Sequence, residues 1–403
     1  MPWQAYHTVW GLLVFGWICN YIVRMALAPL LEPIMAEFGL THAQGGLLFS
    51  AFFYGYVAMQ IPAGLLGDRF GRKRVLVLGI LVVAAAALLT GGAGTLAGLA
   101  LARLVTGLAQ GMYFANDRPI IAAATPPERL AVGQGVSFSG LGLGTALGVV
   151  IGGALGELLP WRQVFLILAA LPLVSAGLIA AFVTDASGRS REAAATASAV
   201  AAVLRLRPLW ALGIAGIAPI WTQWLIGTWG PALFAEVGVT DLGRSALYAS
   251  LLGVAAPPGL LVVGMVSDRL RRRGTPRSAV FAAAILGMAG LTALTGLIVQ
   301  LRGPAWLLAV AVFATSFCFW GSWAPAYALT AELAPRRTMG IAFGALNAVA
   351  FLASLLAPAV TGWIKDWSGS FAGGCYVAAL LGLAAAPVAW TVGAAPAGRP
   401  EPA

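Results

Sequence analysis

The sequence predicts an all-α membrane protein of twelve transmembrane helices in two pseudo-symmetric six-helix bundles. Three observations support this fold class. First, the 403 residues are 60% hydrophobic and only 9% charged, whereas a soluble domain carries about 25% charged residues. Second, the apolar residues fall into long blocks, and one helix needs about 20 such residues to cross a bilayer. Third, an Asp-Arg motif recurs 200 residues further along the chain.

Twelve apolar blocks separated by short polar segments are the predicted helices. Their approximate ranges are 9–35, 44–66, 75–93, 96–122, 131–156, 162–184, 209–235, 244–267, 278–300, 304–331, 339–363 and 371–392. The segment 185–208 is rich in charged and small residues, and we expect it to be a cytoplasmic linker. It would join an N-terminal bundle, 1–184, to a C-terminal bundle with a short tail, 209–403.

The positive charges predict the orientation in the membrane. With the N-terminus inside, 17 of the 24 Lys and Arg residues fall on the inner side, and four (Arg162, Arg244, Arg302 and Lys365) fall outside. Because cytoplasmic loops are enriched in Lys and Arg, we expect a multi-pass protein of the plasma membrane, the inner membrane in a bacterium, with both termini cytoplasmic. The net charge of +10 therefore reflects topology and implies no nucleic-acid partner.

The internal repeat lies after the second block of each half. The run Gly64-Leu-Leu-Gly-Asp68-Arg69 has a counterpart in Gly264-Met-Val-Ser-Asp268-Arg269. Two parallel six-helix repeats around a central site are a known plan of secondary transporters. The chain lacks the phosphate loop of ATPases, a His-Glu-x-x-His motif and any metal-ligand spacing of its three cysteines. We therefore expect no enzyme, no cofactor and no metal site.

These motifs resemble those of the major facilitator superfamily. The resemblance rests on the loop run from Gly64 to Arg74, on Arg103-x3-Gly107-x3-Gly111 and on Pro160-Trp161-Arg162-x2-Phe165. It implies that one group of loop residues helps to hold the inner gate. That group is Gly64, Asp68, Arg69, Arg72, Asp268 and Arg269.

A looser resemblance points to the anion:cation symporter family. It rests on Asn20-Tyr21-x2-Arg24, on Gln60-Ile-Pro62 and on Thr228-Trp229-Gly-Pro231. This resemblance implies transport of organic anions such as sugar acids, often together with protons. The chain departs from it at Val23, where the family often has Asp, and at Gln110, where some members have Glu.

Arg24 lies in the middle of the first block. An Arg at the bilayer centre costs roughly 2.5–3.5 kcal/mol on insertion scales, so it should face a cavity or a partner. Asn20 lies one turn earlier on the same helix face. One interpretation is that Arg24 binds a carboxylate or phosphate of a solute through its forked guanidinium. The other is an internal ion pair with Asp117, or hydrogen bonds to backbone carbonyl groups.

The fourth block carries Arg103, Gln110 and Asp117 at intervals of seven, which places them on one helix face. Tyr113 flanks this face, and Arg118 points away from it. Asp117 is the acidic residue that lies well inside a block, which makes it the candidate for proton coupling. The alternative is a structural ion pair.

Several aromatic and amide residues are candidates for the wall of the cavity. The aromatic ones are Tyr54, Trp224 and Trp320, and the amides are Gln223 and Asn347. The alternative for Trp is an anchor at the membrane interface.

Three arginines against one carboxylate within the blocks predict a positive cavity. We therefore hypothesise a secondary transporter for a small organic anion (a carboxylate or a sugar acid), working as a monomer by alternating access, as a uniporter or with H⁺. One alternative is an exporter of drugs or other lipophilic solutes. A second is a membrane sensor that binds its ligand without transport.

Overall fold

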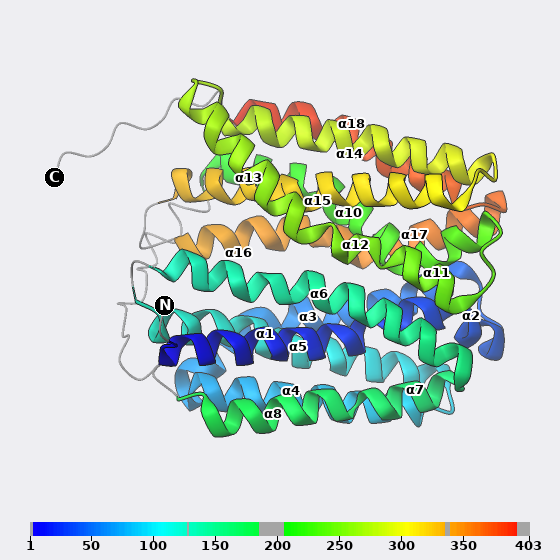
Figure 1. The fold of residues 1–403 in the computed structure, drawn as a ribbon, viewed down its shortest axis with the longest axis horizontal. Helices are drawn as coiled ribbons and strands as arrows, with labels where there is room; N and C mark the ends of the chain where they lie inside the picture. The colour runs from blue at the N-terminus through cyan, green and yellow to red at the C-terminus, as the bar shows by residue number, and fades with distance from the viewer. Residues whose placement is uncertain (1–2, 127–128, 185–204, 335–338, 393–403) are drawn as a thin grey trace.

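A computed structural model of the chain describes residues 3–126, 129–184, 205–334 and 339–392. Within them the helices run side by side along the long axis of the molecule (Figure 1). The N-terminal half consists of α1 (Ala5–Met25), α2 (Leu27–Phe38), α3 (His42–Phe70), α4 (Arg72–Gly91), α5 (Leu96–Ala124), α6 (Leu130–Leu158), α7 (Trp161–Leu168) and α8 (Ala170–Phe182). The C-terminal half consists of α10 (Arg207–Glu236), α11 (Leu242–Ala249), α12 (Leu251–Val254), α13 (Ala256–Arg272), α14 (Arg277–Gln300), α15 (Ala305–Leu333), α16 (Met339–Ala350), α17 (Leu352–Ser368) and α18 (Ala372–Thr391).

These helices form the twelve segments that the apolar blocks predict, and the predicted fold class is confirmed. Ten segments are long and apolar enough to cross a membrane, and α3, which is bent at Pro62, makes an eleventh. The remaining segment is α5, which carries Arg103, Asp117 and Arg118. Most of the predicted linker, 185–204, lies outside the described residues.

Small residues bring α3 and α5 into close contact. A methyl group at Gly107 of α5 would overlap the backbone oxygen of Phe52 in α3, and one at Gly55 of α3 would overlap that of Leu104 in α5. Glycine allows helix backbones to approach each other closely. This contact places the aromatic face of α3 directly against the charged face of α5.

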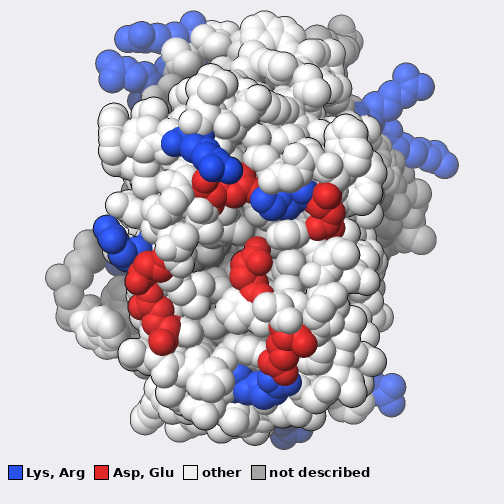
Figure 2. Space-filling view, turned by 90° about the vertical axis from the view of Figure 1, so that its right-hand side faces the viewer, with Lys and Arg blue, Asp and Glu red and all other residues white. Residues whose placement is uncertain are grey.

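The two ends of the molecule carry different charges. We call one the acidic end, because Asp and Glu side chains gather there (Figure 2). Its acidic residues are Glu32, Glu37, Glu157, Glu236, Asp241 and Asp366. We call the opposite end, where α3 ends and α4 begins, the basic end; it carries Arg69, Arg72, Lys73 and Arg74.

The two halves are joined at the acidic end by a reciprocal pair of contacts. Asp366 of α17 accepts hydrogen bonds from the backbone N–H groups of His42 and Ala43 at the start of α3, both at 2.9 Å, and contacts the ring Nδ1 of His42 at 2.7 Å. Glu157 of α6 accepts one from the N–H of Gly243 at the start of α11, at 2.8 Å. A helix N-terminus attracts negative charge, so each half supplies a carboxylate to a helix start of the other.

At the basic end the ion pairs of the repeated motif stay within each half. Asp68 pairs with Arg72 at 2.5 Å, and Asp268 pairs with Arg277 at 2.7 Å. Arg277 also binds Glu332 at 2.9 Å. In the described parts of the chain, the contact between a basic and an acidic side chain that joins the halves is His42–Asp366, at the acidic end. The structure is therefore closed at the acidic end.

The remaining residues of the predicted gate make few contacts here. A methyl group at Gly64 would meet no atom within 4 Å. Arg69 lies over the ring of its neighbour Phe70, and Arg269 lies in the last turn of α13. The gating role of these residues stays a prediction.

We predict that Asp366→Asn weakens closure of the acidic end. Hydrogen bonds to a charged group contribute about 1.5–3 kcal/mol, so the closed-to-open ratio should fall roughly tenfold to a hundredfold. Spin labels at Gln163 and Arg302, in opposite halves, would report a longer distance. The control is Glu236→Gln, because Glu236 accepts hydrogen bonds from Lys365 and from the N–H of Phe371, both in its own half. Equal distances in both variants would contradict the prediction.

Candidate solute-binding site

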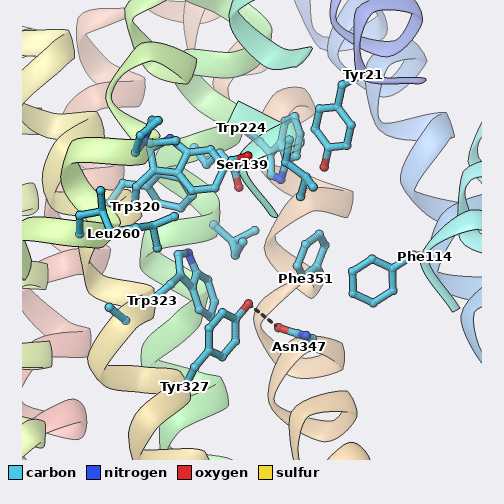
Figure 3. A pocket seen from close by; sticks show the side chains of 18 of the residues that line it. Tyr21, Phe114, Ser139, Trp224, Leu260, Trp320, Trp323, Tyr327, Asn347 and Phe351 are labelled. Carbon is cyan, nitrogen blue, oxygen red and sulfur yellow. Dashed lines mark hydrogen bonds between the residues drawn. The ribbon is translucent and has the colours of Figure 1, made fainter. Parts of the chain in front are cut away.

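A cavity of about 620 Å³ lies between the two halves. Figure 3 shows its aromatic wall, which includes rings from both halves. The N-terminal half contributes Tyr21, Tyr56, Gln60, Phe114, Val136, Ser139 and Leu141. The C-terminal half contributes Ile220, Gln223, Trp224, Ala256, Pro257, Leu260, Leu261, Phe319, Trp320, Trp323, Ala324, Tyr327, Asn347 and Phe351.

The lining is aromatic and apolar, with a few amides and hydroxyls. The Tyr327 hydroxyl lies 3.5 Å from the side-chain oxygen of Asn347 (Figure 3). None of the described lining residues is charged. Such a wall holds a solute by stacking and by a few oriented hydrogen bonds.

Four of the predicted site residues line this cavity. They are Gln223, Trp224, Trp320 and Asn347, all from the C-terminal half. The indole N–H of Trp320 donates to the backbone oxygen of Leu252 at 2.8 Å, so this ring is held in place and offers only its faces and edges to a solute.

Tyr54 was predicted to line the cavity, and the structure corrects this. Its side chain is 46% exposed on the outer surface of the bundle, and Tyr56 takes the place in the wall. The period of the helix explains the difference, since Phe49, Phe52, Tyr56 and Gln60 follow one face of α3. That spacing is visible in the sequence.

Arg24 lies directly behind the cavity wall. Its side chain is 1% exposed, and its Nε and Nη2 atoms have no hydrogen-bond partner. The guanidinium carbon lies 4.5 Å from the ring centre of Trp224, 4.9 Å from that of Tyr21 and 5.9 Å from that of Tyr56. These three rings also line the cavity, so Arg24 is one layer of side chains away from it.

Three further predicted residues lie near Arg24, away from the cavity lining. Arg103 is 1% exposed, and its Nε and Nη2 atoms have no partner. The Gln110 amide donates to the backbone oxygen of Asn20 at 2.8 Å. The side-chain amide of Asn20 and the Oε1 atom of Gln110 are buried without partners.

The last three residues predicted on α5 form hydrogen bonds or an ion pair. The Tyr113 hydroxyl donates to the backbone oxygen of Leu13 at 2.6 Å. The buried carboxylate of Asp117 accepts from the indole of Trp17 at 2.7 Å and from Ser137 at 3.2 Å. Arg118 lies 3.5 Å from Asp117. The alternative for Arg24, an ion pair with Asp117, is not found in the described residues, since Arg118 lies beside Asp117.

Two six-helix bundles that enclose a central cavity and close at one end have the architecture of a secondary transporter. The family comparison agrees with this class. Residues 13–297 match the Major Facilitator Superfamily. The chain therefore belongs to this superfamily, and it is a transporter and not an enzyme.

Relatives extend over nearly the whole chain. It is 30% identical over 389 residues to the "Probable sulfoacetate transporter" of Cupriavidus necator, covering 91% of this chain and 88% of that protein. It is 25% identical to the hexuronate transporter of Bacillus subtilis, covering 90% and 88%. A solved bacterial homologue of the human lysosomal transporter Spinster, inward-facing and unoccupied, matches with a TM-score of 0.84 at 16% identity over 98% of each chain. That likeness shows the shared fold.

We predict that Tyr56→Ala lowers the apparent affinity for a transported solute and that Tyr54→Ala does not. Loss of an aromatic contact in the wall should raise KM roughly tenfold, whereas Tyr54 faces away from the cavity. The measurement is initial uptake against solute concentration in proteoliposomes. Equal shifts in both variants would mean that the cavity is not on the transport route.

Proposed function

We propose that the chain carries small organic anions by alternating access, as a uniporter or with a coupling ion. One observation carries this proposal: the buried guanidinium of Arg24, whose Nε and Nη2 atoms have no hydrogen-bond partner, lies behind three rings of the cavity wall. Arg does not lose its proton in proteins. A buried guanidinium without a carboxylate partner favours the arrival of an anion, and Nε with Nη2 forms the edge that binds an oxyanion in a bidentate manner.

The relatives support the anionic class of solute. The names of two transporters that align over most of the chain specify sulfoacetate and hexuronate. Both solutes are organic acids, and we infer only this class of solute for the present chain.

The mechanism follows from the rings that cover Arg24. Trp224 belongs to α10 of the C-terminal half, whereas Arg24 belongs to α1 of the N-terminal half. Rocking of one half against the other therefore moves Trp224 relative to Arg24. Access of a solute to Arg24 is in this way tied to the relative position of the halves, 1–184 and 209–403, which the linker 185–208 joins.

We further propose that the basic end faces the cytoplasm, with both termini on that side of a plasma membrane, and that one chain is sufficient for transport. The gathering of Lys and Arg at the basic end supports this orientation. The residues of the repeated motif, including Asp68 and Asp268, would then hold the cytoplasmic gate when the acidic end opens.

The uncharged aromatic lining favours a second candidate, transport of lipophilic solutes. A panel of organic anions and lipophilic cations, tested for competition in proteoliposomes, separates the two. Competition by carboxylates or sulfonates supports the anion proposal. Competition by lipophilic cations alone would reject it.

We predict that Arg24→Gln weakens anion binding. Loss of two charge-assisted hydrogen bonds should lower the affinity at least tenfold to a hundredfold. Arg302→Gln is the matched control, because Arg302 lies in the exposed turn between α14 and α15. The measurement is equilibrium binding to the purified protein. Unchanged affinity in Arg24→Gln would show that the site is elsewhere.

Proton coupling, if present, would use Asp117, the buried carboxylate that accepts from Trp17 and Ser137. We predict that Asp117→Asn abolishes accumulation driven by a pH gradient and leaves solute exchange intact. If exchange and thermal stability are lost together, Asp117 serves as a structural ion pair with Arg118. Accumulation that survives in the variant would exclude Asp117 from coupling.

A further inference from the structure

Four buried polar side chains form a cluster in the N-terminal half, beside the cavity and separated from it by aromatic rings. We call Arg24, Asn20, Arg103 and Gln110 the arginine cluster. Each member is at most 1% exposed. Each has at least one side-chain nitrogen or oxygen atom without a hydrogen-bond partner. Such unmet polar atoms are rare in folded proteins and point to a group that the resting structure does not hold.

The cluster carries two positive charges with no opposing charge. Arg118, the third arginine within the predicted helices, lies beside Asp117 at 3.5 Å. No Asp or Glu among the described residues forms an ion pair with Arg24 or Arg103. Among the described residues buried in the N-terminal half, Arg24 and Arg103 thus leave two positive charges unbalanced.

The surroundings offset only part of this charge. The guanidinium of Arg24 lies over the rings of Phe52 and Phe53 at 4.1 Å and 4.8 Å, in addition to the three cavity rings. Cation–π contacts contribute about 0.5–2 kcal/mol each. Burial of an ion in a protein costs several kcal/mol. Two like charges in one apolar region also repel each other, and neither guanidinium can release its proton.

The two guanidinium groups are close enough for one small molecule to reach both. Arg24 lies 4.1 Å and Arg103 5.6 Å from the centre of the same Phe52 ring. In both, the free atoms are Nε and Nη2, the pair that binds one oxyanion with two parallel hydrogen bonds. The free amide of Asn20 adds a donor and an acceptor, which suits a polar group between two acid groups.

From this arrangement we propose that the transported solute is a small organic dianion, with one acid group bound by Arg24 and the other by Arg103. This inference rests on the proposed function and narrows it from an organic anion to a doubly charged one. The acid groups are carboxylates or sulfonates, since both present two oxygens to a guanidinium edge. Entry requires Tyr21, Tyr56 and Trp224 to move aside, because these rings separate Arg24 from the cavity.

Gln110 provides a nearly isosteric test of charge balance. Gln110→Glu changes neither the length nor the shape of the side chain and adds one negative charge to the arginine cluster. The solute then needs to supply only one negative charge to balance the two arginines. The variant should therefore prefer monoanions, the reverse of the native preference. The control is Gln163→Glu, which adds the same charge at an exposed position in the first turn of α7.

The experiment measures binding of matched acids to the purified full-length protein in detergent. The probes are dicarboxylates of two to six carbons, monocarboxylates of the same lengths, sulfoacetate and methanesulfonate, each with and without added chloride. We expect the native protein to bind its best dianion roughly tenfold to a hundredfold tighter than the matched monoanion. Arg103→Gln should remove this preference, and Gln110→Glu should invert it while Gln163→Glu keeps it.

Three results would overturn the inference. They differ in whether they also reject the proposed function. Monoanions that bind as tightly as dianions, with Gln110→Glu without effect, reject the dianion but keep an anion transporter. Tight monoanion binding that requires chloride assigns the second charge to an inorganic ion. Binding of lipophilic cations with no binding of any acid rejects the proposed function itself.

Discussion

The structure depends on a single electrostatic constraint: a guanidinium in the interior of a membrane protein needs a negative partner. Arg118 has one in Asp117, at 3.5 Å. Arg24 and Arg103 are more deeply buried, at 1% exposed against 19% for the Arg118 side chain, and both lie near aromatic rings. The close contact of α3 with α5 places the Phe52 ring near both guanidinium groups. The N-terminal half therefore carries unbalanced charge, and the C-terminal half shapes an aromatic cavity beside it.

The same constraint connects binding with conformational change. Trp224 covers Arg24 from the opposite half, so the cover moves when the halves rock. At the acidic end, Asp366 and Glu157 each bind a helix start of the other half. These contacts follow the internal repeat, because α3 corresponds to α11–α13 and α6 to α16–α17. The two halves thus make equivalent contacts at the acidic end. They differ in the interior, where only the N-terminal half carries the arginine cluster.

The sequence predicted the fold well because hydrophobic blocks and loop charges report directly on the membrane. It also identified Arg24 and Arg103, since a charge inside an apolar block is conspicuous. It did not predict that Arg24 is shielded from the cavity, which depends on how rings of two halves meet. The error at Tyr54 arose from choosing a residue by type and not by helical phase, which favours Tyr56. The capping of α3 by Asp366 joins positions 324 residues apart, and no local pattern indicates it.

The most direct test of the central claim is an experimental structure of the protein with a bound acidic solute. We predict density for an acid group against the Nε and Nη2 atoms of Arg24, with Trp224 and Tyr56 displaced from their present positions. A solute held among Trp320 and Trp323 in the cavity, with the rings over Arg24 unchanged, would contradict it.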